Sequence, residues 1–275
     1  MIRVFMVLAL VCPALSAFAW GNPGHEIIAR VAQARLSANV RSEVLELLRN
    51  RDCRPIRRSM AEVSTLPDRF RNQEGGQIGR SWHFVNIDIA HTDYAQERDC
   101  PLGDCVIRRV DRAAEMLRND EDQFSDCERK DALIYIIHFV GDLHQPFHCG
   151  FGRFQNGDRD RGGNSVQVTI GGERTNLHSA WDGLLLDDRT QDEWIAHLQD
   201  EVIPALDQDL ANETSVAAWA DESHDVARTE HPRPPRRNVV SELDANYVEK
   251  NRPVVEQRLA LAAVRLAKLI TRSLQ

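Results

Sequence analysis

The sequence predicts an all-α fold, a single mostly helical domain with one small β-hairpin. Beyond residue 20, most of the chain carries apolar residues at a spacing of three or four, which is typical of helices that bury one face. Residues 129–144 are apolar nearly all round, as in a central buried helix. The one clear strand pattern is at residues 165–170, where apolar and polar side chains alternate between two glycine pairs.

The individual elements follow from this spacing in chain order. We expect helices over residues 24–37, 40–50, 104–118, 129–144, 190–210, 213–228 and 253–273. The last helix would begin at Pro253, because proline is favoured in the first turn. The loops over residues 150–163 and 230–238 are too short to require a domain boundary. Residues 20–275 are therefore expected to form one domain.

Residues 1–19 have the features of a cleaved signal peptide. Arg3 supplies a positive charge, residues 4–15 are largely apolar, and Ala-Phe-Ala at 17–19 matches the pattern that signal peptidase cleaves. The apolar run is shorter than the roughly 20 residues that span a bilayer, and no other run approaches that length. We therefore expect an exported protein, periplasmic or secreted, that begins at Trp20.

Export makes disulfide bonds possible, and all but one of the six cysteines lie after the leader. Cys100 and Cys105 flank the turn sequence Pro-Leu-Gly-Asp and are the best candidate pair. Cys53, Cys127 and Cys149 cannot all pair within one chain, and the sequence leaves their connectivity open.

The balance of charge limits the possible function classes. The formal net charge of −8 argues against a protein that binds polyanions mainly through basic side chains. A nucleic-acid enzyme that draws positive charge from bound metal remains compatible, because each zinc ion adds two charges at its site.

Two short motifs carry metal-ligand chemistry. Residues 138–148 read His-Phe-Val-Gly-Asp-Leu-His-Gln-Pro-Phe-His, and residues 176–182 read Asn-Leu-His-Ser-Ala-Trp-Asp. Each motif holds a His and an Asp four residues apart, which places both side chains on one face of a helix. Imidazole and carboxylate groups are ligands that zinc accepts, and a carboxylate in an apolar helix needs such a partner.

Further histidines and acids occur in short motifs elsewhere in the chain. His25 follows the expected new N-terminus closely, Asp68 lies in Leu-Pro-Asp-Arg-Phe-Arg, and His83 lies in Trp-His-Phe-Val-Asn. Each alone has an ordinary explanation. A histidine could be satisfied in the core, and Asp68, followed by Arg69 and Arg71, could form a surface ion pair worth under about 1 kcal/mol. Their occurrence together favours a metal centre.

With these motifs in view, the chain from Trp20 to the C-terminus resembles the secreted, zinc-dependent, single-strand-specific nucleases of fungi, plants and bacteria, the S1/P1 type. The resemblance implies three zinc ions. The first would be held by the α-amine and carbonyl of Trp20, by His25, and by Asp142, which would bridge to the second. The second and third zinc ions would take the remaining ligands, respectively Asp68, His83 and His138, and His148, His178 and Asp182.

The same resemblance implies an endonuclease of single-stranded DNA and RNA that leaves 5′-phosphates and also acts as a 3′-nucleotidase. Two zinc ions that share a water would lower its pKa toward neutrality, and Asp68 would orient that water. Arg71 would pair with a phosphate oxygen. Phe84 and Asn86 stand where the family contacts the base, and Asn164 is a further candidate. A stacked base must be unpaired, which fits a single-stranded substrate.

The sequence leaves several alternatives open. Phe84 could pack in the core, and the glycines before Asn164 could simply enter the hairpin. Leu66-Pro67 departs from the tryptophan-alanine pair that is common in the family before the Asp. His144 matches no family ligand and is expected to be structural. Cys149, next to a ligand, is expected to be a buried thiol or a disulfide partner.

Two other functions compete with the nuclease. Zinc phospholipase C resembles the same scaffold, but that branch tends to carry Glu where this chain has Asp182, and Phe84 and Asn86 fit a base better than a choline head group. A non-catalytic periplasmic zinc-binding protein would have no need of Asp68 and Arg71 beside the cluster. We expect a monomer that acts on nucleic acid and nucleotides, without a membrane after leader removal.

Overall fold

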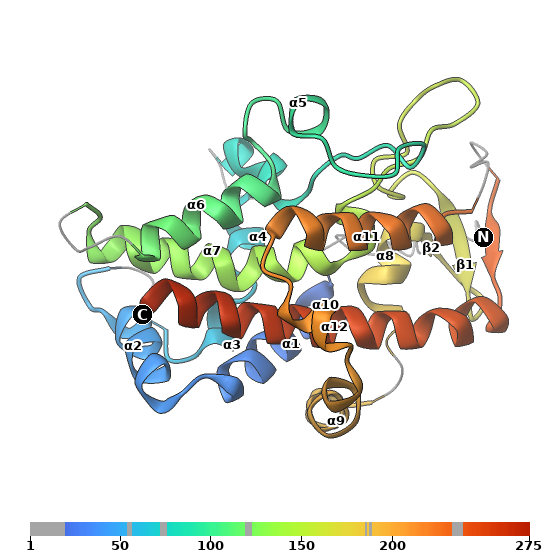
Figure 1. Ribbon diagram of the computed structural model, residues 1–275. Coiled ribbons are helices and arrows are strands. Elements are labelled where there is room, and N and C mark those ends of the chain that lie inside the picture. The colour runs from blue at the N-terminus through green and yellow to red at the C-terminus, as the bar shows by residue number, and fades with distance from the viewer. Residues whose placement is uncertain are drawn as a thin grey trace, which may run out of the picture.

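The computed structural model describes residues 20–53, 57–71, 76–118, 123–184, 186, 189–232 and 239–275. It confirms a single mostly helical domain, with a small sheet at one end of the molecule (Figure 1). The expected signal peptide, residues 1–19, and residues 233–238 of the second expected loop lie outside the described residues.

The elements are as follows. The α-helices are α1 (Gly21–Arg35), α2 (Ala38–Arg49), α3 (Met60–Val63), α4 (Leu66–Arg71), α5 (Gln96–Asp99), α6 (Val106–Arg118), α7 (Asp126–His144), α8 (Leu177–Ser179), α9 (Gln191–His197), α10 (Gln208–Asn212), α11 (Val216–Glu230) and α12 (Ala245–Leu274). Short 3-10 and π-helical turns are η1 (Gly76–His83), η2 (Pro146–His148), η3 (Ala180–Leu184), η4 (Leu198–Val202) and η5 (Ile203–Ala205). The strands are β1 (Gln167–Ile170), β2 (Glu173–Asn176) and β3 (Ser241–Leu243).

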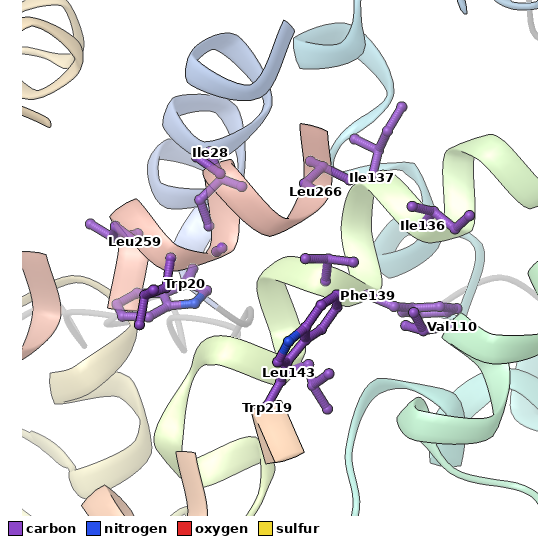
Figure 2. Close-up of a cluster of buried hydrophobic side chains, with 14 of the residues drawn as sticks. Trp20, Ile28, Val110, Ile136, Ile137, Phe139, Leu143, Trp219, Leu259 and Leu266 are labelled. Carbon is purple, nitrogen blue, oxygen red and sulfur yellow. The ribbon is translucent and has the colours of Figure 1, made fainter. Parts of the chain in front are cut away.

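Helix α7 is the centre of the fold, as its all-round apolar sequence predicts. A capping box starts it: the Ser125 side chain accepts from the Glu128 backbone, and the Glu128 side chain accepts from Ser125. Helices α1, α6 and α12 pack around it (Figure 1). Figure 2 shows how Phe139 and Leu143 of α7 lie among the apolar side chains of these helices. The helix that carries His138 and Asp142 is therefore closely packed on several sides.

The small sheet extends the expected hairpin by a third strand. Strands β1 and β2 pair antiparallel through a turn at Gly171 and Gly172, whose φ angles of 56° and 83° suit a two-residue hairpin. Strand β3 pairs parallel to the other edge of β1. The sequence predicted only the hairpin because β3 has just three residues and pairs across a long separation, which local alternation does not reveal.

Two helix boundaries differ from the expectation. Helix α12 begins at Ala245, so the prediction that it starts at Pro253 is wrong. The Asp244 side chain caps α12 by accepting from the Tyr247 backbone. Pro253 lies inside the helix, where it removes one intrahelical hydrogen bond. The expected helix over 190–210 is divided into α9, η4 and η5, with Pro204 inside the last turn.

Two disulfide bonds connect the chain. Cys100 pairs with Cys105, which confirms the predicted pair, and Cys53 pairs with Cys127. Cys149 is a buried free thiol. Its Sγ lies 3.3 Å from the Leu143 carbonyl, and burial raises the pKa of the thiol to about 12. It therefore behaves as a small core residue.

The Cys53–Cys127 bond closes 74 residues of chain and should contribute more stability than the short Cys100–Cys105 loop. We expect C53S/C127S to lower the free energy of unfolding by about 4 kcal/mol and C100S/C105S by about 2 kcal/mol, because longer loops lose more unfolded-state entropy. Chemical denaturation of both double variants measures the difference. Equal losses would contradict the loop-length explanation.

Candidate metal centre

The predicted ligands on α7 meet side chains from three other segments. His138 and Asp142 lie one turn apart on α7 and are both completely buried. His25 reaches them from α1, Asp68 from α4, and His83 from the end of η1. When several buried His and Asp side chains lie this close together, each needs a hydrogen bond or an ion to compensate for its lost hydration.

Asp68, His83, His138 and Asp142 point their ligand atoms at a common centre. His83 Nδ1 lies 2.9 Å from Asp142 Oδ2 and 3.0 Å from His138 Nε2. Asp68 Oδ1 lies 3.6 Å from His83 Nδ1 and 3.8 Å from His138 Nε2. Separations of 3 to 4 Å between ligand atoms suit a tetrahedral ion with metal–ligand distances of about 2 Å.

Asp142 has its two carboxylate oxygens facing different groups. Its Oδ2 lies against His83 and His138, at 2.9 and 3.1 Å, whereas its Oδ1 lies 3.3 Å from His25 Nε2. One carboxylate thus faces two neighbouring sets of ligands. This is the arrangement that a carboxylate needs to bridge two cations.

Gly141 makes room for this approach of α1 to α7. A Cβ at this position would lie 2.7 Å from His25 Nδ1, closer than real side chains allow. The His25 ring stacks on His138, with 4.1 Å between ring centroids. The glycine before Asp142 in the motif therefore has a packing reason that the sequence alone did not reveal.

A second group forms from His148, His178 and Asp182, beside the first. Their ligand atoms lie within 4.8 Å of one another. His148 Nε2 faces His178 Nε2 at 3.2 Å, and His178 Nε2 lies 3.7 Å from Asp182 Oδ2. His148 also lies 3.9 Å from Asp142, so the two groups adjoin. The three residues are the set that the family resemblance implies for the third zinc ion.

Backbone carbonyls fix the tautomers of three of these rings. The Nδ1 atoms of His138, His148 and His178 lie 2.6, 2.5 and 2.7 Å from the carbonyls of Ser64, His83 and Gly162. A carbonyl accepts only, so each Nδ1 donates and a neutral ring leaves an unprotonated Nε2 pointing into the cluster. Two such lone pairs 3.2 Å apart repel each other unless a cation lies between them.

Buried polar atoms without a hydrogen-bond partner also support a bound cation at this site. Both ring nitrogens of His25, Oδ1 of Asp142 and Oδ2 of Asp182 are buried and make no hydrogen bond with the part of the chain that the structure describes. Buried polar atoms almost always have a partner, and an ion is one of the few explanations for several together. The donor set of imidazoles and carboxylates suits zinc.

Burial keeps most of the imidazoles neutral, as metal ligands must be. Burial is the main reason that the pKa of His148 falls to about 3 and that of His178 to about 4. Burial also lowers the pKa of His138, but the carboxylates of Asp142 and Asp68 outweigh it and raise that pKa to about 8. Metal binding at His138 would therefore displace a proton near neutral pH.

The two aspartates of the cluster have opposite shifts. Burial raises the pKa of Asp182 well above its ordinary value. Burial acts in the same direction on Asp142, but His138 and His148 outweigh it and hold the pKa of Asp142 well below the ordinary range. Asp142 is therefore ionised in the protein, and Asp182 is the carboxylate that most needs a positive charge.

Trp20 begins α1 at the edge of the cluster. Its side chain is completely buried, and its indole Nε1 donates to the Gly141 carbonyl at 2.8 Å. Its backbone N–H bonds to the Asp182 carboxylate, and its carbonyl accepts from Gly24 at 3.1 Å. The first residue of the expected mature chain thus has its backbone nitrogen at the Asp182 carboxylate. Its side chain packs among the apolar residues of the core (Figure 2).

His144 lies outside the cluster, as the sequence predicts. Its Nδ1 donates to the Val140 carbonyl at 2.7 Å, and Arg265 of α12 donates to its Nε2 at 3.0 Å. Arg265 in turn pairs with Glu222 of α11 at 2.7 Å. His144 therefore ties α7 to two neighbouring helices.

Sequence reasoning missed the groups that orient the ligands. Gln145 Nε2 donates to Asp182 Oδ1 at 2.6 Å, and three backbone carbonyls hold the imidazoles. Gln145 lies inside the first motif, so its position was a usable signal. The carbonyls leave no trace in side-chain identity.

A cavity of about 450 Å³ opens beside the second group. The predicted substrate residues Phe84, Asn86 and Asn164 line it, together with His148 and His178. Phe84 is half-buried and faces this cavity, which weighs against the alternative that it is an ordinary core residue. An aromatic ring and two amides therefore lie close to the candidate metal ligands.

Arg71 lines the same cavity from α4. Its Nε lies 3.3 Å from Asp68 Oδ1, one helical turn earlier. Pro67, where the family commonly has an alanine, lies in the first turn of α4, a position that proline favours. The departure from the family pattern thus leaves Asp68 and Arg71 on one face of a short helix.

Comparisons with known proteins show which family the sequence matches. A family model described as S1/P1 Nuclease matches residues 20–275. Nuclease S1 of Aspergillus oryzae is 26% identical over 274 residues, which cover 91% of this chain and 90% of that protein. Endonuclease 3 of Arabidopsis thaliana is 27% identical over 293 residues, covering 98% and 95%. Nuclease P1 of Penicillium citrinum is 29% identical over 168 residues, covering 59% and 57%.

Proposed function

The chain belongs to the S1/P1 nuclease family and is a hydrolase of phosphodiester bonds, and we propose that it is an exported, three-zinc endonuclease of single-stranded DNA and RNA. The proposal includes 5′-phosphorylated products and 3′-nucleotidase activity. The observation that carries it is the pair of oxygens of Asp142, which face two adjoining ligand sets next to a cavity lined by the half-buried ring of Phe84.

We assign the ligands to three ions. The first takes the α-amine and carbonyl of Trp20, His25 and Asp142, the second takes Asp142 with Asp68, His83 and His138, and the third takes His148, His178 and Asp182. Bound zinc supplies Lewis-acid charge at a phosphate and acidifies a coordinated water. The unsatisfied atoms of His25, Asp142 and Asp182 support these assignments.

The side chains around the ions have separate tasks in this proposal. Asp68 orients the attacking water through the carboxylate that also faces His83. Arg71, 3.3 Å from Asp68 and exposed to the cavity, pairs with a non-bridging phosphate oxygen. Asp68 in turn keeps the Arg71 guanidinium in place. A phosphate bound by Arg71 would therefore lie close to the Asp68 carboxylate, which orients the water.

Base binding falls to the other wall of the cavity. Phe84 offers a face for stacking, and Asn86 and Asn164 offer amides to the base edges. Asn164 is held by its own loop, because its Nδ2 donates to the Arg161 carbonyl at 2.9 Å. Stacking on Phe84 accepts any unpaired base and excludes a paired one. It therefore supports a preference for single strands, but no preference between RNA and DNA.

Export and a monomeric state complete the proposal. The two disulfide bonds fit an oxidising compartment, periplasmic or extracellular. Within the described ranges, helices long and apolar enough to cross a membrane were not found. The domain proposal is a cleaved leader at 1–19 and one catalytic domain at 20–275.

The test compares three activities of zinc-loaded mature protein. We expect release of acid-soluble nucleotide from single-stranded DNA and RNA, with far less from duplex DNA and no diacylglycerol from phosphatidylcholine. Diacylglycerol release without nucleotide release would favour the phospholipase alternative. Stoichiometric zinc without either activity between about pH 5 and 9 would favour a non-catalytic zinc-binding protein. This pH range is relevant because histidine and acid side chains must lose their protons before they bind zinc.

A further inference from the structure

The cavity beside the candidate metal centre is strongly cationic. Among the described residues, its lining includes four arginines and no Asp or Glu. This contrasts with a chain of net charge −8. The four are Arg71, Arg80, Arg159 and Arg161. Only Arg71 is needed for the phosphate that is cleaved, so three positive charges remain to be explained.

Arg159 and Arg161 belong to a loop with an unusual backbone. Arg161 has a φ of 61°, which is uncommon for a residue with a side chain, and Gly162 and Gly163 follow at 61° and 77°. Strain of this kind persists only where the surroundings impose it, and it concentrates at binding sites. An arginine thus occupies a backbone position at which glycine would be less strained, and its side chain lines the cavity.

Buried contacts on both sides hold this loop in place. Asp160, completely buried, pairs with His231 after α11 at 2.5 Å. Two residues on, the Gly162 carbonyl bonds to the candidate ligand His178. A Cβ at Gly162 would lie 2.5 Å from the Phe147 carbonyl, so the loop is also closely packed. The arginines are thus positioned relative to the metal ligands.

Arg159 is held over an aromatic ring. Its guanidinium carbon lies 4.6 Å from the centre of the Phe151 ring, which lines the same cavity. Arg153 approaches the same ring at 5.2 Å but is paired with Asp88 at 2.6 Å. A guanidinium that lies over an aromatic ring keeps the N–H groups at its own edge available for an anion.

We propose that Arg159 and Arg161, with Arg80, form a second phosphate subsite that binds a phosphodiester next to the scissile one. The subsite rests on the proposed nuclease function and makes the enzyme prefer oligonucleotides to substrates with one phosphate. The chemistry is charge-assisted hydrogen bonding of guanidinium to non-bridging phosphate oxygens. Because these contacts are to the backbone, they favour no particular base sequence.

The test uses a matched pair of substrates. A dinucleoside monophosphate has only the scissile phosphate, whereas a single-stranded decanucleotide also has neighbouring ones. For R159Q/R161N we expect kcat/KM to fall about tenfold on the decanucleotide, mainly through KM, and to stay within about twofold on the dinucleoside monophosphate. Asparagine is used at 161 because it tolerates a positive φ.

Salt dependence supplies a readout that a structural defect would not produce. The slope of log(kcat/KM) against log salt on the decanucleotide should become shallower by about 0.7 for each phosphate contact removed. R159K/R161K, which keeps both charges, should retain most of the decanucleotide activity. R272Q removes one exposed arginine in the last turn of α12, away from the cavity lining, and should behave as wild type.

The outcomes separate the two proposals. Equal losses on both substrates, or an unchanged salt slope, would overturn the subsite and leave the nuclease intact. No loss on the decanucleotide would do the same. A wild-type enzyme that cleaves neither substrate would overturn the nuclease proposal itself, and the subsite with it.

Discussion

Asp142→Asn should lower kcat on single-stranded DNA about a thousandfold, since several kcal/mol of metal-derived stabilisation would be lost. The substitution keeps the shape of the side chain and removes its charge. Both oxygens of Asp142 face ligand sets, so its loss should affect two zinc sites together. We expect roughly one zinc ion per chain to remain of the proposed three, measured by metal analysis after dialysis.

Asp131→Asn is the matched control. It makes the same change on the same helix, at an exposed position about two helical turns before His138. It should leave both zinc content and activity unchanged. If D142N loses only one zinc ion, or keeps its activity, then Asp142 is not the bridge between two ions.

The second large effect concerns the N-terminus of the mature chain. Adding a single residue before Trp20 should lower zinc content by roughly one ion and activity about a hundredfold, because the α-amine becomes an amide whose nitrogen cannot ligate. The backbone nitrogen of Trp20 lies against Asp182, and the buried indole bonded to Gly141 prevents it from shifting. Metal analysis and nuclease assays on the two proteins measure the effect.

A removable extension controls for misfolding. If the added residue is cleaved by an aminopeptidase, zinc binding and activity should return in the same sample. An extended protein that holds the full zinc content with normal activity would show that Trp20 does not ligate through its amine. It would also mean that leader removal is not a precondition for the site.

The helices were the most predictable part of the fold. The all-round apolar sequence of α7 predicted a buried central helix, and its spacing predicted that His138 and Asp142 share a face. The start of α12 was missed, because the first-turn preference of Pro253 was outweighed by the cap at Asp244. Strand β3 was missed because its pairing partner lies far away in the sequence.

Part of the candidate site was also predictable from the sequence, and part of it required the structure. The motifs identified each His and Asp of the candidate metal-binding groups among the described residues. The cysteine spacing identified one of the two disulfide bonds. The connectivity of Cys53 and Cys127 depended on two segments that meet only when the chain is folded. The unusual backbone at Arg161 and the role of Gly141 likewise required coordinates.

By itself, the sequence determined which side chains have the chemistry of zinc ligands and which of them share a helical face, because those properties depend on residue type and local periodicity. Only the tertiary structure decided that α1, α4 and η1 bring three more ligands to α7, and that the two oxygens of Asp142 face different histidines. Backbone carbonyls then turned the imidazoles inward. Those contacts come from packing between distant segments, which local sequence does not encode.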